Sequence, residues 1–496
     1  MEKIKSVLIS VFNKEGIDNL CKKLHQNNIE IISTGGTKKY IEKLNIPVTS
    51  VESLTDYPSI LGGRVKTLHP KVFGAILSRK ENLSDLDDIK KYNISKIDMV
   101  IVDLYPFQKT VESGKKEQDI IEKIDIGGVS LIRAAAKNFS DVLIVSSRSQ
   151  YDNVLDYLSE NSFSSDINFR KRMAFDAFSE VLSYDSEIEE YFGLTTNVYK
   201  NLRYGENPHQ KGIFKGDIGD VFDQINGKEL SYNNLLDVDS AVRLISEFDD
   251  PTFAILKHNN ACGIASSSDA ISSYTKAFDA DPLSAFGGVL IYNESIDKAA
   301  AEKINNLFFE IIIAPKYTGE SLEILKSKKN RIILIQKKKI FKSHVSRDVL
   351  NGKLKQEADN EIKDYNSWQL ATEKKLDKSS IEDLEFANRI VKHSKSNSIV
   401  LVKDKQMLSS GVGQTSRVDA LKFAIEKAKT FNFDLKGSVM ASDAFFPFPD
   451  CIEIASEAGI QGVIQPGGSI KDDLSIESCN QRGISMYLSG TRHFYH

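Results

Sequence analysis

The sequence predicts an α/β protein with two mixed domains, and three observations support this fold class. Short apolar runs alternate with helix-like segments through residues 1–195, and further strand-like runs follow residue 200 between glycine and proline turns. The chain has 496 residues, of which 41% are hydrophobic. This is enough sequence for two or three domains with their own cores.

The first part of the chain has the pattern of a parallel sheet. Apolar runs predict strands at 7–12, 29–34, 97–103 and 141–147, and helix-like patterns predict helices at 14–27, 37–45 and 119–138. Repeated strand and helix units of this size predict parallel strands with helices on both faces. Ligands of such sheets bind where the carboxyl ends of the strands meet.

Residues 168–192 predict one long amphipathic helix or two short ones, followed by a polar segment. We therefore expect two domains, 1–197 and 198–496. Strand-like runs follow at 252–258, 287–293, 331–336 and 397–402. The second domain is thus also expected to mix helices and strands.

Charge and cysteine content exclude several classes of protein. Lys and Arg total 65 and Asp and Glu total 69, so no whole-chain charge favours nucleic acid or an anionic membrane. Four cysteines lie far apart without a C-x-x-C pair, which argues against a disulfide framework or a cysteine-rich zinc site. No apolar stretch approaches about 18 residues. We expect a soluble, unexported cytoplasmic protein with no nucleic-acid or membrane partner.

Three polar loops in the first domain could bind a phosphate. They are NK at 13–14, STGGT at 33–37 and GGRVKTLHP at 62–70. Glycines after a strand let backbone N–H groups converge on an anion, although each loop alone could be an ordinary turn. Because several of these loops follow predicted strands, they can meet at one edge of the sheet.

A second set of residues in this domain could move protons. Asp125 precedes a predicted helix that ends at Lys137, and Lys66 and Tyr105 lie in other loops. Loss of water from a carbinolamine needs an acid and a base close together, which these groups could provide around a nucleotide. The alternative for Lys137 is a solvated residue that complements the helix dipole.

In the second domain, Lys257 and His258 stand side by side at the end of an apolar run. Such a pair offers a base next to a positive charge, which suits deprotonation of an amine while an oxyanion develops. SDAFFPF at 442–448 could enclose a flat heteroaromatic ligand. The alternatives are an ordinary strand-end pair and phenylalanines buried in a core.

Together these motifs resemble one family, the bifunctional purine-synthesis enzymes that combine AICAR (phosphoribosylaminoimidazolecarboxamide) transformylase with IMP cyclohydrolase. The resemblance covers the whole chain and follows the family order: ISVFNKEG, STGGT, GGRVKTLHP, LYPF, IDIGG, RAAAKN, RYGENPHQ, LKHNNACG, GQTSR, SDAFFPF and TRHFYH. It implies a methylglyoxal-synthase-like parallel-sheet domain over 1–197. Over 198–496 it implies a transformylase domain of two cytidine-deaminase-like subdomains.

The resemblance also implies a cyclohydrolase site in the first domain. Its catalytic residues would be Lys137, as proton donor and acceptor, with Lys66, Tyr105 and Asp125. The residues that bind IMP or formyl-AICAR (FAICAR) would be Asn13, Lys14, Thr34, Gly35, Gly36, Thr37, Arg64, Val65, Lys66, Thr67, Asp103, Asp125 and Ile126.

For the transformylase, the resemblance implies His258 as the base and Lys257 as the stabiliser of the transition state. AICAR would be held by Arg203, Tyr204, His258, Gly287, Glu310, Asn397, Arg417, Phe445 and Arg492. The folate, 10-formyltetrahydrofolate, would be a co-substrate in contact with Val418, Asp450, Ser469 and Ile470. No tightly bound cofactor and no metal are expected.

Three positions depart from the commonest family pattern. Asp103 stands where Asn is frequent, Ala261 where Pro is usual, and Pro449 where Arg is frequent. The resemblance also implies a homodimer whose transformylase sites lie across the subunit interface.

Two other functions compete with this interpretation. A nucleotide-sensing protein could use the same loops without turnover, but it would not need proton-transfer groups in both domains. A zinc nucleoside deaminase needs H-x-E and P-C-x-x-C motifs, and the sequence contains neither.

Overall fold

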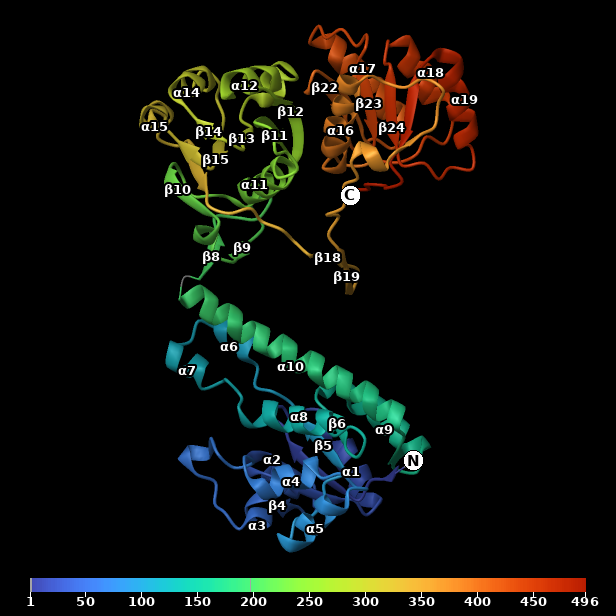
Figure 1. Ribbon diagram of the computed structural model, residues 1–496. Coiled ribbons are helices and arrows are strands. Elements are labelled where there is room, and N and C mark those ends of the chain that lie inside the picture. The colour runs from blue at the N-terminus through green and yellow to red at the C-terminus, as the bar shows by residue number, and fades with distance from the viewer. Residues whose placement is uncertain (1, 197) are drawn as a thin grey trace. The chain divides into compact units, whose positions relative to one another are not determined.

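The computed structural model describes residues 2–196 and 198–496, and the chain divides into two compact units, Met1–Val198 and Tyr199–His496 (Figure 1). The expected boundary involves residue 197, which lies outside the described residues. Separate clusters of buried apolar side chains stabilise each unit, so each is described by itself. None of the helices in the described part of the chain has the length and apolar composition that crossing a membrane would need.

A five-stranded parallel sheet forms the centre of the first unit, in the order β4-β3-β2-β5-β6. Four of its strands confirm the apolar runs predicted as strands, and short β4 was not predicted. Central residues such as Val7, Leu8 and Ile9 are fully buried because helices cover both faces. The strands of this unit are β1 Glu2–Lys3, β2 Ser6–Ser10, β3 Glu30–Ser33, β4 Thr49–Ser50, β5 Met99–Val102, β6 Leu143–Val145 and β7 Ser164–Ser165, of which β1 and β7 form a separate pair.

The helices of the first unit confirm most of the predicted helical segments. The region 168–192 forms a single helix, α10, which packs along α8. The helices are α1 Ile17–Gln26, α2 Gly35–Lys43, α3 Val51–Thr55, α4 Pro70–Leu77, α5 Leu83–Lys91, α6 Phe107–Glu112, α7 Glu117–Ile121, α8 Gly127–Lys137, α9 Tyr151–Glu160 and α10 Ile167–Thr195, with short 3₁₀ turns at Leu61–Gly63 and Arg148–Gln150.

The prediction of one helix over 119–138 was wrong, because the chain breaks at 122–126 between α7 and α8. Asp125 accepts the N–H of Gly128 at 2.7 Å, and a side chain that binds the start of a helix in this way favours a new helix over a continuous one. A Cβ at 128 would lie 2.5 Å from Asp125 Oδ2, so any other residue there would displace this carboxylate. Asp125 therefore lies in the loop between the two helices and not within a helix.

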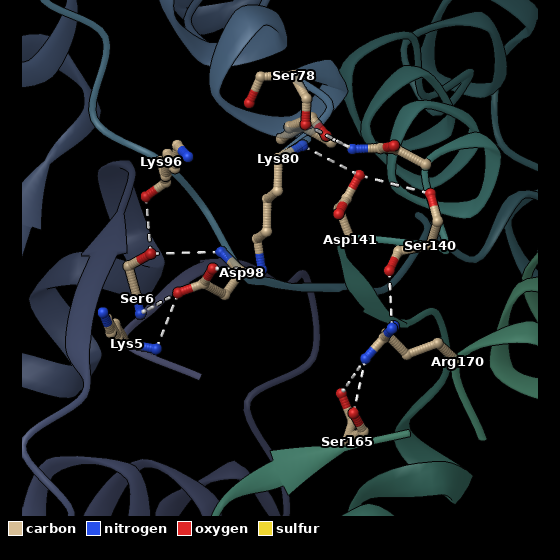
Figure 2. Close-up of polar contacts among 12 residues, drawn as sticks. Lys5, Ser6, Ser78, Lys80, Lys96, Asp98, Ser140, Asp141, Ser165 and Arg170 are labelled. Atoms are coloured by element: carbon tan, nitrogen blue, oxygen red, sulfur yellow. Dashed lines mark hydrogen bonds and ion pairs between the residues drawn. The ribbon is translucent and has the colours of Figure 1, made fainter. Parts of the chain in front are cut away.

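Polar side chains fasten the amino ends of the strands (Figure 2). Asp98 accepts the backbone N–H groups of Lys5 and Ser6 at 2.9 and 3.3 Å and forms an ion pair with Lys80 at 3.2 Å. Buried Arg170 donates to the carbonyls of Ser165 and Ser140, each at 2.7 Å. These contacts therefore stabilise the amino edge of the sheet, and the loops that could bind a ligand lie at its carboxyl edge.

A twelve-stranded sheet runs through the second unit in the order β10-β17-β15-β13-β11-β12-β22-β21-β23-β24-β25-β20. The four runs predicted as strands in this part correspond to β11, β13, β17 and β21 and are confirmed. The strands are β8 Tyr199–Leu202, β9 Gly212–Lys215, β10 Phe222–Asn226, β11 Thr252–Lys257, β12 Asn260–Ser266, β13 Val289–Tyr292, β14 Ser295–Ile296, β15 Ile311–Ala314, β16 Lys316–Tyr317, β17 Ile332–Gln336, β18 His344–Val349, β19 Gly352–Glu357, β20 Gln369–Leu370, β21 Ile399–Lys403, β22 Gln406–Gly411, β23 Val439–Ser442, β24 Gly462–Gln465 and β25 Ser485–Leu488.

Helices flank this sheet (Figure 1). They are α11 Tyr232–Ile245, α12 Ala270–Asp279, α13 Pro282–Ala285, α14 Lys298–Ile304, α15 Gly319–Lys326, α16 Lys378–Lys392, α17 Arg417–Thr430, α18 Asp450–Glu457 and α19 Asp472–Arg482, with short 3₁₀ turns at Ile218–Asp220 and Tyr365–Ser367.

The second unit contains the same arrangement twice. In each half a helix leads into an antiparallel hairpin, followed by strands that alternate with helices and pair in parallel: α11 with β11, β12, β13, β15 and β17, then α16 with β21, β22, β23, β24 and β25. The halves meet at the antiparallel pair of β12 and β22, where Ala265 lies opposite Gln406. The unit is thus a duplicated scaffold joined edge to edge.

Each half has a glycine where a helix crosses the second strand of its hairpin, and the two glycines stand at different register positions. A Cβ at Gly263 in β12 would lie 1.8 Å from the Ala277 carbonyl oxygen of α12, and one at Gly411 in β22 would lie 1.9 Å from the Ala420 carbonyl oxygen of α17. Only glycine fits at these positions, where a helix crosses directly over a strand.

Candidate active sites in the two units

A cavity of about 620 Å³ opens at the carboxyl edge of the sheet in the first unit. Its size suits a small-molecule ligand. Most residues that the sequence assigned to a nucleotide site line it: Lys14, Thr34, Gly36, Thr37, Arg64, Lys66, Thr67, Asp103, Tyr105, Asp125 and Ile126. Residues not assigned from the sequence also line it, including Ser10, Phe12, Gly62, Gly63, Glu122, Gly127 and Gly128.

One side of the cavity is suited to an anion. The first turn of α2 begins after Thr34, whose side chain makes no capping bond, and Gly35 has a φ of +45°. Free N–H groups at the start of a helix attract negative charge. The Lys66 ammonium approaches the same turn, since its Nζ lies 3.8 Å from the position that a Cβ at Gly35 would take. The end of β3 and the 62–67 loop therefore build one anion-binding corner.

Two carboxylates and a phenol lie on the other side. Burial raises the pKa of Asp125, and the nearby charge of Asp103 raises it further, whereas the Gly128 N–H and Lys66 lower it. Burial also raises the pKa of Tyr105, and Asp125 adds to that increase. A carboxyl group with a raised pKa is suited to proton transfer near neutral pH.

Asp103 also has a structural role in the site. Its carboxylate accepts the N–H of Asn13 at 2.9 Å and that of Phe12, which fixes the loop after β2. Burial raises the pKa of Asp103, and these two N–H groups oppose that change. An asparagine could accept these bonds with only one oxygen, so Asp is the better acceptor here.

The loop that carries Asp125 is held by a residue that sequence patterns did not indicate. The buried hydroxyl of Tyr184 in α10 accepts the Asp125 N–H at 2.8 Å and donates to the Lys123 carbonyl at 2.7 Å. Its ring packs edge-on to Phe107. Because Tyr184 is 59 positions from Asp125, no local signal could have revealed this contact.

Four expected residues do not line the cavity. Asn13 and Gly35 lie directly beside it, and Val65 lies between lining residues and pairs with Ile60. Lys137 is different: it is exposed at the last position of α8, whereas Gly127 at the first position lines the cavity. At about 1.5 Å per residue, the two ends are about 15 Å apart. Lys137 of the same chain is therefore not among the residues that line this cavity.

In the second unit, the first half brings together Lys257 and His258, the expected proton-transfer pair, and their neighbours. Exposed His258 follows Lys257 in the turn of the β11–β12 hairpin, and Lys257 Nζ donates to the Phe286 carbonyl at 2.8 Å, next to Gly287. The Glu310 carboxylate accepts a hydrogen bond from the Asn234 side chain at 3.1 Å, and the Glu310 N–H donates to the Gly288 carbonyl. The pair is thus presented at the end of a rigid strand.

The second half gathers residues around a buried ion pair. Arg417 at the start of α17 donates to Asp443 and Asn397, each at 2.8 Å, and to the Phe445 carbonyl at 3.2 Å. The Asp443 side chain is 0% exposed and that of Arg417 10%. Arg492 lies beside this group, because the next residue donates its N–H to the Asp443 carbonyl.

A hydrogen bond links the two groups at the seam between the halves. The Lys395 N–H donates to Asn260 Oδ1 at 3.3 Å, which places the loop before β21 next to the hairpin that carries His258. The segment with Arg203 and Tyr204 is tied to the start of α11, since Asn233 donates to the Glu206 carbonyl at 3.2 Å. The expected AICAR residues therefore come from both halves of the sheet.

The residues expected to contact folate flank the second group. Val418 follows Arg417 in α17, Asp450 begins α18, and Ser469 with fully exposed Ile470 lies in the loop after β24. These positions lie at the start of helices or at the carboxyl ends of parallel strands, where ligands of such sheets bind.

Comparisons with known proteins find relatives that match the chain along its whole length. A family model described as the AICARFT/IMPCHase bienzyme matches residues 135–427, and one described as an MGS-like domain matches residues 16–130. The bifunctional purine biosynthesis protein PurH of Bacteroides thetaiotaomicron is 58% identical over 503 residues, which cover 100% of this chain and 99% of that protein. The PurH proteins of Aquifex aeolicus and Acetivibrio thermocellus are 44% and 43% identical, each over 99% of this chain and over 99% and 100% of their own lengths.

Proposed function

The chain belongs to the AICARFT/IMPCHase bienzyme family, and we propose that its two units divide the last two steps of IMP synthesis between them. It is a bifunctional purine biosynthesis enzyme, with AICAR formyltransferase and IMP cyclohydrolase activities. The observation that carries the division is the cavity of the first unit, where Lys66, Tyr105 and Asp125 surround a space next to an anion-binding helix start.

The first unit is proposed to close the ring of FAICAR. The substrate phosphate binds at the start of α2 beside Lys66, which leaves the base of the nucleotide near Asp125 and Tyr105. The carboxamide nitrogen attacks the formyl carbon, and Asp125 accepts the proton that this nitrogen loses and passes it to the formyl oxygen. The resulting hydroxyl then leaves as water with the proton of the formamide nitrogen, and a C=N bond of the new ring forms as the C–O bond breaks. The raised pKa of Asp125 supports its role as the base.

Lys137 is proposed to serve this reaction from a second copy of the chain. It does not line the cavity of its own chain, yet the family resemblance implies a catalytic role for it. A homodimer would reconcile this observation with that expectation. The exposed apolar side chains Phe175 and Leu182, seven residues apart on α10 and 71% and 70% exposed, support such an association.

The role of Lys137 in a second copy can be tested by mixing variants. Chains with Lys137→Ala and chains with Asp125→Asn are each expected to lose cyclisation, and co-expression of both is expected to restore it through mixed dimers. Restoration requires that one site take Lys137 and Asp125 from different chains. If co-expressed variants stay inactive while Lys137→Ala alone is inactive, the proposal is wrong.

The second unit is proposed to transfer the formyl group. The amine of AICAR attacks the formyl carbon of 10-formyltetrahydrofolate, His258 accepts the amine proton, and Lys257 stabilises the anionic tetrahedral intermediate. The bond to the folate nitrogen then breaks, and tetrahydrofolate leaves with a proton. Arg417, Asn397 and Arg492 hold AICAR, and Val418, Asp450, Ser469 and Ile470 contact the folate.

The folate acts as a co-substrate, and no tightly bound cofactor is proposed. We also propose that the enzyme works in the cytoplasm, because its four cysteines are free and buried, which suits a reducing compartment.

The proposed function is tested by incubating the purified chain with AICAR and 10-formyltetrahydrofolate and following tetrahydrofolate and IMP. We expect both products to form, with IMP after a lag. If AICAR or IMP binds but neither product forms, the chain is a sensor and the catalytic roles are wrong.

A further inference from the structure

The duplicated scaffold of the second unit contains two hairpin turns with the same strained backbone. His258 and Asn259, between β11 and β12, have φ of +50° and +63°, and Asp404 and Lys405, between β21 and β22, have φ of +53° and +51°. Two-residue turns of this type favour Asn-Gly because both positions are left-handed. Neither turn has a glycine, so other contacts must hold both in place.

An aspartate from the preceding helix holds each turn. Asp237 of α11 accepts the Asn259 N–H at 2.7 Å. Asp383 of α16 accepts the N–H groups of Asp404 and Lys405 at 2.9 and 2.7 Å. The two carboxylates occupy equivalent places in the two halves, so the same device holds both turns.

We propose that Asp237 is a positioning residue for formyl transfer, because its carboxylate fixes the turn that presents His258 to AICAR. This inference rests on the proposed role of His258 as the base. The turn of the other half carries no proposed catalytic group, so its aspartate serves the fold alone. A comparison of Asp237 with Asp383 therefore distinguishes the effect of stabilising a turn from the effect of positioning the proposed base.

The surroundings of Asp237 agree with this role. Ser240, one turn further along α11, donates to the Asn259 side chain at 3.3 Å, and Asn260 donates to the His258 carbonyl at 2.9 Å. The second oxygen of Asp237 has no hydrogen-bond partner among the described residues, so the bond to the Asn259 N–H is the contact through which this carboxylate holds the turn. Burial raises the pKa of Asp237 and the Glu310 charge adds to this, whereas Asn259 and His258 lower it.

The test compares Asp237→Ala with Asp383→Ala in the full-length chain, with tetrahydrofolate release as the measurement. Misplacing a base by a fraction of an ångström costs on the order of 10- to 100-fold in rate, so Asp237→Ala is expected to lower kcat by that amount with little change in the KM for AICAR. Asp383→Ala removes two turn contacts and should leave kcat close to wild type. Cyclisation of FAICAR by the same samples reports whether the chain remains folded.

Two further variants distinguish positioning from a general loss of stability. Asp237→Asn keeps an oxygen that can accept the Asn259 N–H, so it should retain most of the transfer rate. Asn259→Gly, introduced into the Asp237→Ala chain, should restore much of the rate, because glycine adopts the left-handed conformation without help. In a His258→Ala background, Asp237→Ala should have little further effect.

The inference is overturned if Asp237→Ala transfers formyl groups at the wild-type rate, or if Asp383→Ala lowers kcat equally. It is also overturned if Asn259→Gly fails to rescue a folded Asp237→Ala chain. A wild-type chain that releases no tetrahydrofolate contradicts the proposed function itself, and the two failures are therefore distinguishable.

Discussion

The two units of this chain gather their polar side chains in different ways. In the first unit a single sheet edge brings Lys66 and Asp125 to one cavity of about 620 Å³. In the second unit His258 lies on a hairpin of one half, and Arg417 lies at the start of a helix in the other. A hydrogen bond from Lys395 to Asn260 joins the two halves at their seam.

We relate this difference to the number of substrates in the two proposed reactions. Ring closure involves one molecule, which one set of loops at one sheet edge can surround. Formyl transfer joins two molecules, and a duplicated sheet can assign proton transfer to one half and binding to the other. The following variants test that division.

Loss of the base in the second unit should have the largest effect. His258→Ala is expected to lower kcat for formyl transfer by about 10²- to 10⁴-fold, the usual contribution of a positioned base. Cyclisation of FAICAR by the same protein should be unchanged, because His258 belongs to the other unit. Exposed His344→Ala is the control. Equal loss of both activities would show that the units are not independent.

The reciprocal change in the first unit is Asp125→Asn. It removes the proposed base but keeps the size of the side chain, so we expect about a 10²- to 10³-fold loss of cyclisation. Formyl transfer should continue, and FAICAR should accumulate in a coupled assay. Exposed Asp152→Asn in α9 should leave both rates unchanged. Cyclisation at the wild-type rate would exclude Asp125 as the base.

The buried ion pair of the second half should matter for stability as well as binding. Arg417→Ala leaves the fully buried Asp443 carboxylate without its partner, which we expect to cost about 3–5 kcal/mol of unfolding free energy. By contrast, the exposed pair of Arg482 and Glu453 should contribute about 1 kcal/mol or less. Urea denaturation of Arg417→Ala and Arg482→Ala would measure both, and similar values would contradict the assignment.

A smaller effect is expected on the pH dependence of cyclisation. Asp125 must be ionised to act as a base, so activity is lost as pH falls through its pKa, which lies above the ordinary value of about 3.9. Because Asp103 helps to raise that pKa, Asp103→Asn should move the acidic limb of kcat to lower pH, by about one unit or less. A limb that stays in place or moves to higher pH would assign it to another group.

Local sequence patterns predicted the parts of this fold that depend on local periodicity. The runs around Val7 and Ile255 could be predicted as strands, because strands that are buried on both faces have continuous apolar sequences. The loops with Lys66 and Asp125 meet because parallel strands end at the same edge. The break at 122–126 was missed, since helical periodicity continues on both sides of it.

Long-range contacts could not be predicted in this way. Tyr184 and Asp237 act through hydrogen bonds to residues that include Asp125 and Asn259, 59 and 22 positions away, and no pattern marks such pairs. Local patterns did not reveal the duplication of the second unit, because its two turns share a backbone shape and not a sequence; the two subdomains were expected from the family resemblance alone. The distance of Lys137 from the cavity could not be predicted either, because it depends on the residue at which α8 begins, and only the structure shows that residue.

The central claim is that one chain carries two separate active sites, and a complementation assay tests it most directly. His258→Ala and Asp125→Asn proteins are purified separately and supplied with AICAR and 10-formyltetrahydrofolate, alone and mixed. We predict that neither variant alone makes IMP at a significant rate, and that the mixture does, because one releases FAICAR and the other cyclises it. If the mixture makes no IMP, or if either variant makes it alone at the wild-type rate, the assignment of one reaction to each unit is wrong.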